Sequence, residues 1–157
     1  MNERLDDLYR DIILDHYRSP RGRNPVERAD IATDGHNPSC GDEVELKVEI
    51  DEDRVKNIHV DCRGCAISVA SGSMLAEVIK GKSINEIKEI SRVVRAMLKG
   101  DTDDIPEDLG DLDALKGVRQ FPVRIKCALL AWLALIEGVK NFEEGHGADG
   151  SSISTEE

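Results

Sequence analysis

The hydrophobic residues between Ala29 and Cys62 recur at every second position, whereas those on either side recur at helical spacing. In the run EVELKVEI, residues 43–50, apolar and charged residues alternate strictly. Such alternation is typical of a strand that buries one face and exposes the other. Shorter runs over residues 29–33 and 58–62, the latter after the turn DEDR, have the same period. The sequence therefore predicts a small three-stranded antiparallel sheet with one buried face.

Helical periodicity outside this region predicts about five helices that pack on the sheet. The predicted ranges are residues 3–17, 64–81, 83–100, a short piece over 111–116, and 122–142. The third range opens with a capping box and the last with a proline, and both features favour a helix start. The expected fold class is α+β, with any metal site at one end of the sheet.

The length of 157 residues fits one domain, which we expect to span residues 1–143. The remainder, residues 144–157, has few apolar side chains and is predicted to be a disordered acidic tail. A domain of this size buries about two thirds of its unfolded surface and does not need a metal merely to fold. A metal site in such a chain therefore indicates function.

The charge balance indicates which partners suit the protein. There are 21 Lys plus Arg against 32 Asp plus Glu, a net charge of -11. Negative charge repels nucleic-acid phosphates and anionic membranes, so we expect proteins or cations as partners. The start MNERLDDLYR lacks the features of a signal peptide, and no apolar run approaches a membrane span of about 20 residues. The expected location is cytoplasmic.

Four cysteines are the main candidates for chemistry, because cytoplasmic cysteines are thiols or metal ligands more often than disulfides. Cys40 lies in the loop NPSCGD before a strand, and both Cys65 and Cys127 lie near predicted helix starts. Helix N-termini favour thiolates. If these segments meet, they and Asp42 would supply three sulfurs and one oxygen, which suits zinc or one iron of a small cluster.

The pair CRGC allows other interpretations, because its two cysteines could form a redox dithiol or half of a zinc ribbon. A ribbon needs a second close pair, which the sequence lacks. A thioredoxin-like dithiol follows the first strand of a βαβ unit, whereas this pair follows a predicted hairpin. The alternation places Cys62 on the buried face with Ile58 and Val60, so we expect Cys62 to be a core residue.

The histidines are weaker candidates. His36 lies close to Cys40 but belongs to a polar loop, and His16, His59 and His146 fall on a helix, an outward strand face and the tail. None has HExxH spacing. The sequence also lacks a GxSxG elbow, a P-loop and a dinucleotide fingerprint, which argues against a hydrolase or a nucleotide-dependent enzyme.

Three separate motifs resemble one known family. DGHNPSCGDEVEL, GCAISVASGSML and GVRQFPVRIKCALLAW are similar to the SufU branch of the IscU-like proteins of iron-sulfur cluster assembly, and the resemblance covers roughly residues 5–140. Classical IscU scaffolds have a histidine before the last cysteine, where this chain has Lys126. They also lack the insertion that ends here in LGDLDALKGV. Both features favour the SufU branch.

The resemblance implies a zinc site formed by Cys40, Asp42, Cys65 and Cys127, with Arg124 close to it. It further implies that Cys40 accepts persulfide sulfur from a SufS-like cysteine desulfurase and passes it to a downstream scaffold or acceptor protein, as a zinc-dependent sulfurtransferase. The alternative is a scaffold that assembles a [2Fe-2S] cluster on the same ligands, and a third reading is a structural zinc module. No motif position of the family corresponds to Cys62.

Overall fold

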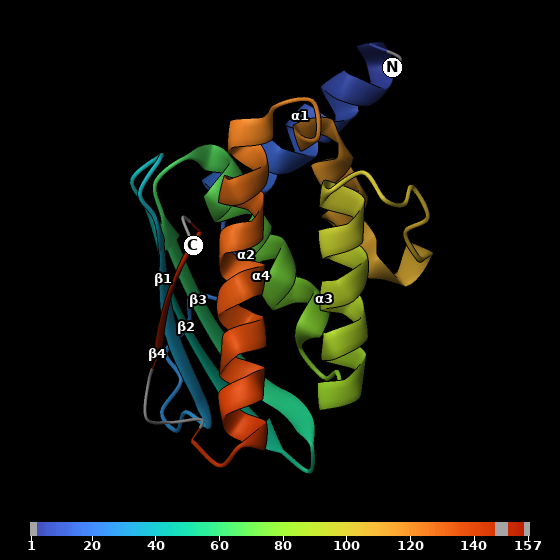
Figure 1. Cartoon of the computed structure of the whole chain (residues 1–157). Helices are drawn as coiled ribbons and strands as arrows, with labels where there is room; N and C mark the ends of the chain where they lie inside the picture. Colours follow the sequence, from blue (N-terminus) through green and yellow to red (C-terminus); the bar gives the residue numbers. More distant parts are fainter. Residues whose placement is uncertain (1–2, 147–150, 156–157) are drawn as a thin grey trace.

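The sheet of the computed structural model holds four strands in the order β3-β2-β1-β4 (Figure 1). The structure describes residues 3–146 and 151–155. Strand β1 runs antiparallel to β2 and parallel to β4, and β2 runs antiparallel to β3. The α+β class is confirmed, but the predicted count of three strands is wrong. The strand bounds are β1 Ile31–Asn37, β2 Asp42–Asp51, β3 Arg54–Arg63 and β4 Ser151–Ser154.

Strand β4 lies within the tail that the sequence predicts to be disordered over residues 144–157. That prediction is wrong for Ser151–Ser154, which pairs with β1 through its backbone. Main-chain pairing needs no apolar alternation, and the single apolar residue Ile153 packs against the core. Positions 147–150 and 156–157 of the predicted tail lie outside the described residues. The domain boundary at residue 143 stays a prediction.

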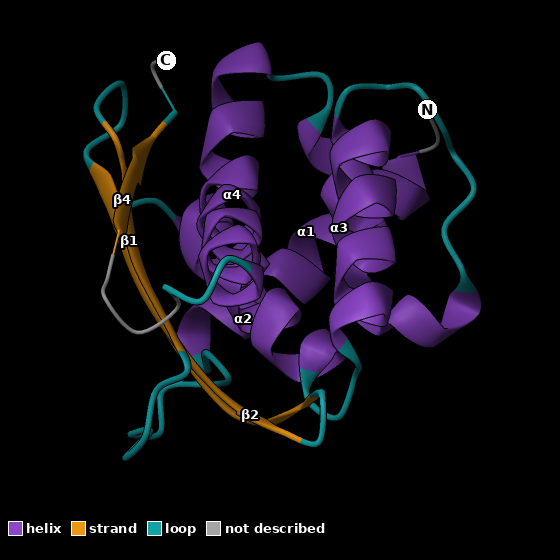
Figure 2. Cartoon of the chain, turned by 60° about the horizontal axis from the view of Figure 1, so that its bottom comes forward, coloured by secondary structure: helices purple, strands orange, loops and turns teal. Residues whose placement is uncertain are grey.

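The helices all cover one face of the sheet (Figure 2). Helices α2 and α4 contact the strands, whereas α1, α3 and the 3-10 helix η1 pack on those two. Helix η1 is longer than the predicted short piece over 111–116, with a kink at Gly110. Among the described residues, no helix combines the length and apolar character needed to cross a bilayer. The helix bounds are α1 Glu3–Arg18, α2 Ala66–Ile79, α3 Ile84–Leu98, η1 Glu107–Val118 and α4 Pro122–Glu143.

Helix α2 lies at the centre of the molecule and is buried on nearly every side. Its small residues allow close contact with neighbouring elements, and its Ser71 and Ser73 hydroxyls find hydrogen-bond partners there. The Ser71 hydroxyl donates to the carbonyl of Ala128 at 2.6 Å and accepts from the Trp132 indole at 3.1 Å. These bonds connect α2 to α4 while keeping buried polar groups satisfied.

His16 is fully buried and joins α1 to two other elements. Its Nδ1 lies 2.7 Å from the Ser73 hydroxyl of α2, and its Nε2 lies 2.8 Å from the Asp111 carboxylate of η1. Both ring nitrogens are therefore engaged within the protein. This arrangement explains why a histidine interrupts the apolar face of the first helix.

Cys62 is a core residue, as the alternation predicts, with 2% of its surface exposed. Its neighbour is Gly72 of α2, where an added Cβ would lie 2.5 Å from the Cys62 sulfur. The glycine thus makes room for the sulfur between β3 and α2. A thiol at this strand position requires a small residue on the facing helix.

We expect Gly72→Ala to lower the free energy of unfolding by about 1–3 kcal/mol, because the added methyl group overpacks the Cys62 sulfur. Cys62→Ala alone should cost about 1 kcal/mol through lost packing. In the double variant the alanine at 62 leaves space for the alanine at 72, so its cost should be smaller than the sum. Urea denaturation of the four proteins measures this coupling. Strictly additive costs would contradict the proposed contact.

Candidate metal centre

Cys40 lies in the tight turn that connects β1 to β2. The backbone amides of Cys40 and Gly41 both donate to the carbonyl of Asn37, at 3.3 and 2.9 Å. Gly41 has a φ of +70°, a conformation that glycine adopts at low cost. The side chain of Cys40 is partly exposed. The turn therefore presents this sulfur at the surface, at one end of the sheet.

Asp42 begins β2, and its buried carboxylate points at the N-terminus of α2. Its Oδ1 accepts the backbone N–H of Cys65 at 2.8 Å, and its Oδ2 lies 3.7 Å from the Cys65 sulfur. Cys65 is the N-cap of α2, where its sulfur accepts the Ser68 amide. Gly64 has a φ of +130°, and an added Cβ would collide with the Asp42 carboxylate. Only glycine permits this close approach.

Cys127 reaches the same place from the first turns of α4. It is buried, and its sulfur lies 3.4 Å from the sulfur of Cys40. Potential ligand atoms of Cys40, Asp42 and Cys127 all lie within 4.8 Å of one another. Cys65 contacts Asp42, but its sulfur does not lie within 4.8 Å of all three of these atoms. The four predicted ligand positions thus meet at one end of the sheet.

The donor set and its spacing suit a tetrahedral metal ion. Two sulfurs bound to one tetrahedral zinc lie about 3.8 Å apart, as follows from a Zn–S distance of about 2.3 Å. The Cys40 and Cys127 sulfurs are 3.4 Å apart in the protein, so only a small adjustment separates the two arrangements. Three thiols and one carboxylate oxygen are donors that zinc accepts.

The surroundings of the Cys127 sulfur disfavour an uncompensated negative charge beside the Asp42 carboxylate. Burial, and then contact with Asp42, raises the pKa of the Cys127 thiol, because both disfavour another negative charge. Arg124 opposes this effect from the solvent-exposed side. Its interaction with the Cys127 sulfur raises the pKa of the guanidinium, and Cys65 adds to the shift. Cys40 and Arg124 also line the same hollow, and a functional role for Arg124 stays a prediction.

Asn37 is a residue of this centre whose role the sequence interpretation missed. It is fully buried, and its side-chain Nδ2 lies 3.5 Å from both the Asp42 Oδ2 and the Cys127 sulfur. In the sequence it reads as one of several turn-forming residues in NPSCGD. Its proximity to Cys40 in the chain was the only available signal.

Cys62 is excluded from this group by its burial between β3 and α2. Burial raises the pKa of the Cys62 thiol to about 12, and the adjacent Asp61 carboxylate adds to the shift. The thiol is therefore neutral over the physiological range. This supports a packing role and argues against the redox dithiol interpretation of CRGC, since a reactive pair needs a thiolate.

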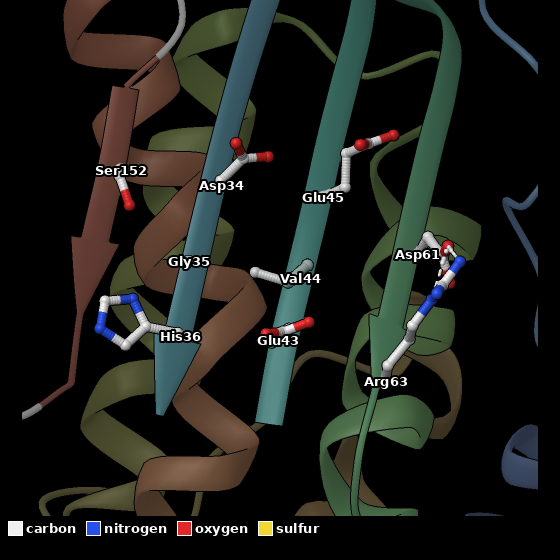
Figure 3. A pocket seen from close by; sticks show the side chains of 9 residues that line it. All are labelled: Asp34, Gly35, His36, Glu43, Val44, Glu45, Asp61, Arg63 and Ser152. Atoms are coloured by element: carbon white, nitrogen blue, oxygen red, sulfur yellow. Dashed lines mark hydrogen bonds and ion pairs between the residues drawn. The ribbon is translucent and has the colours of Figure 1, made fainter. Parts of the chain in front are cut away.

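The outer face of the sheet carries polar side chains on the side away from the helices (Figure 3). His36, Glu43, Glu45 and Asp61 line a shallow hollow there, together with Arg63. Arg63 pairs with Asp61 at 3.1 Å. His36 thus lies on the opposite face of the sheet from the buried Asp42 carboxylate, as the alternation of β1 and β2 requires.

A second group of potential ligands comprises His16, Glu77 and Asp111, whose donor atoms also lie within 4.8 Å of one another. Both nitrogens of His16 already contact protein partners. Arg21 also lies beside Glu77, at 3.4 Å, and its positive charge opposes a bound cation. The interactions here favour a structural role.

The chain belongs to the family of NifU-like N-terminal domains, whose family model matches residues 8–148. It is 44% identical over 145 residues to the zinc-dependent sulfurtransferase SufU of Bacillus subtilis (strain 168), which covers 92% of this chain and 98% of that protein. It is 36% identical over 137 residues to the iron-sulfur cluster assembly scaffold protein IscU of Streptococcus pyogenes serotype M1, with coverages of 87% and 86%.

A solved structure from Fervidobacterium islandicum AW-1 has the same fold. It is described as a putative iron-sulfur cluster assembly scaffold protein for the SUF system. Its TM-score is 0.74 at 32% sequence identity, and the match covers 81% of this chain and 93% of that one. The family resemblance expected from the three cysteine motifs is therefore confirmed.

The raised pKa of Cys62 predicts a pH dependence of stability. The pKa of the Cys62 thiol is near 9.0 in the unfolded chain and near 12 in the folded protein. Burial of the neutral thiol therefore costs no stability below about pH 9, and the free energy of unfolding falls as the pH rises from about 9 toward 12. Above about pH 9 the free energy of unfolding of the wild type should fall by about 1.4 kcal/mol per pH unit, and Cys62→Ala should not show this additional fall. Urea titrations at about pH 8 and about pH 10 measure the difference. A pH-independent difference would contradict this burial.

Proposed function

We propose that this protein is a zinc-dependent sulfur carrier of iron-sulfur cluster assembly, which accepts persulfide sulfur on Cys40 from a cysteine desulfurase. The observation that carries the proposal is the contrast within the ligand group. Cys40 lies partly exposed in a glycine-containing turn, whereas Asp42 and Cys127 are buried and the partly exposed Cys65 is held as the N-cap of helix α2. The name of the Bacillus subtilis relative, a zinc-dependent sulfurtransferase, supports the same activity here.

Cys40, Asp42, Cys65 and Cys127 are the residues that would hold the zinc ion. Bound zinc keeps cysteine sulfurs as thiolates at neutral pH and protects them from stray oxidation. The carboxylate of Asp42 is a harder donor than the sulfurs. We infer that the mixed set tolerates the exchange of one sulfur while the other ligands stay in place.

The chemical step is an exchange between sulfurs. The Cys40 thiolate attacks the terminal sulfur of the desulfurase persulfide, so a new S–S bond forms while the partner's S–S bond breaks. The electron pair of the broken bond leaves on the partner's cysteine, which becomes a thiolate, and no external oxidant is needed. The Arg124 guanidinium lies beside the sulfurs and stabilises negative charge there.

The surface around Cys40 suits the approach of a protein. A hollow next to its sulfur is lined by Ile67, Phe121, Val123 and Arg124. Phe121 and Val123 are more than half exposed, at 52% and 58%. Exposed apolar side chains beside a reactive group are typical of docking surfaces. We expect a SufS-like desulfurase to dock here, and a downstream scaffold or acceptor protein to receive the sulfur afterwards.

The second candidate is a scaffold for a [2Fe-2S] cluster on the same ligands. It is favoured by the three sulfur donors at one place and by the IscU relative of Streptococcus pyogenes, which is named a scaffold. Purification with and without oxygen, followed by measurement of metal and acid-labile sulfide, separates the two. Zinc without sulfide supports the carrier. Sulfide with visible absorption in the anaerobic sample supports the scaffold.

Replacing Cys127 by Ser should abolish stoichiometric zinc binding, because a neutral hydroxyl is a much poorer zinc ligand than a thiolate. Asp42→Ala should weaken binding less, since three sulfurs remain and water can complete the coordination. Cys62→Ala is the matched control and should bind zinc like wild type. Metal analysis after dialysis measures all three. Full zinc content in Cys127→Ser would remove the proposed site.

Cys40→Ser should remain folded but fail to accept sulfur, because its turn is outside the core and its hydroxyl does not attack a persulfide. The measurement is mass spectrometry after incubation with a desulfurase and free cysteine, without reductant. Peptide mapping then locates the added sulfur, with Cys62→Ala as the control that still accepts it. Persulfide found chiefly on another cysteine of the wild type would overturn the assignment to Cys40.

A further inference from the structure

The C-terminal segment Ser151–Thr155 ends beside the metal centre, although it follows the last helix in the chain. Strand β4 pairs with β1 in parallel register, from Thr33 opposite Ser151 to His36 opposite Ser154. The next residue continues the contact, since the Thr155 backbone N–H donates to the carbonyl of His36 at 3.2 Å. The segment therefore runs along β1 toward the turn that carries Cys40.

The position of this segment is fixed by packing as well as by backbone pairing. An added Cβ at Gly35 would lie 2.9 Å from Cδ1 of Ile153, so the isoleucine occupies the space that a side chain on β1 would need. Ile153 also contacts the hydrophobic core. These contacts set where Thr155 lies relative to the end of β1.

Thr155 is connected to two ligand positions through a single amide. Its hydroxyl donates to Oδ1 of Asn37 at 2.8 Å. The Nδ2 of Asn37 faces the Asp42 carboxylate and the Cys127 sulfur, both at 3.5 Å. This orientation of the amide places its donor against two acceptors. With the amide reversed, its oxygen would face a carboxylate and a sulfur, which repel it.

We propose that Thr155 and Asn37 are positioning residues of the metal centre, and that the C-terminal segment controls how tightly Asp42 and Cys127 hold a bound metal. The inference rests on the proposed function for the identity of the metal. Donors to ligand atoms fix their orientation and commonly change metal affinity by about 10- to 100-fold. Without the Thr155 hydroxyl, the buried Oδ1 of Asn37 loses this donor, and the amide is no longer held toward the two ligands.

The test compares zinc release from full-length protein loaded with zinc, using a chromophoric chelator in excess. Thr155→Val keeps the size and shape of the side chain but removes its hydroxyl. It should release zinc about tenfold faster than wild type. Thr155→Ser restores the hydroxyl and should return the rate to that of wild type. Ser152→Ala, at an exposed position of β4, is the matched control and should leave the rate unchanged.

A second comparison tests whether Thr155 acts through Asn37. In Asn37→Ala the amide is absent, so adding Thr155→Val should change zinc release no further, whereas independent effects would multiply. The cobalt-substituted proteins give a second readout, because the visible spectrum of bound Co²⁺ reports ligand geometry. This spectrum should shift in Thr155→Val and stay unchanged in Thr155→Ser and Ser152→Ala. Circular dichroism confirms that the variants are folded.

Three results would overturn the proposal: unchanged zinc release in Thr155→Val, equal acceleration in Ser152→Ala, or multiplicative effects with Asn37→Ala. These results are distinguishable from failure of the proposed function. A wild type that binds zinc at Asp42 and Cys127 but accepts no sulfur on Cys40 would end the sulfur-carrier proposal, and zinc release would still decide the role of Thr155. A wild type that binds no metal would overturn both.

Discussion

The hydrogen bond from the Cys65 amide to the buried Asp42 carboxylate joins the start of β2 to the N-terminus of α2. A carboxylate at a helix start is stabilised by the free N–H groups there and by the helix dipole. The rest of the candidate metal centre depends on this contact. Gly64 makes room for it, and Cys65 caps the same helix with its sulfur. The turn that carries Cys40 immediately precedes the anchored aspartate.

The ligand group combines a fixed part and an accessible part. Asp42 and Cys127 are buried and come from a strand and a helix that pack in the core, whereas Cys40 lies partly exposed in a turn. A carrier needs both properties, because a metal must stay bound while one sulfur meets a partner. The same asymmetry would hinder a purely structural zinc site, in which all ligands are closed off.

The periodicity of apolar residues predicted the strands β2 and β3, the main helices and the burial of Cys62, because each of these depends on a periodic apolar face. The resemblance of the cysteine motifs predicted which ligand positions would meet. Strand β4 was missed because backbone pairing with β1 leaves little trace in side-chain pattern. Asn37 and Gly64 were missed for a related reason. Their roles depend on contacts with Asp42 that only the folded chain creates.

Strand β4 also has a consequence for association between molecules. It pairs with the backbone of β1 from Thr33 to His36, so this part of β1 is not an unpaired edge of the sheet. A long unpaired border invites strand addition from a second chain, and native sheets commonly close it with a short strand. At four residues, β4 is itself too short to template such growth efficiently. The polar C-terminal residues thereby cover the β1 side of the sheet against pairing with a second chain.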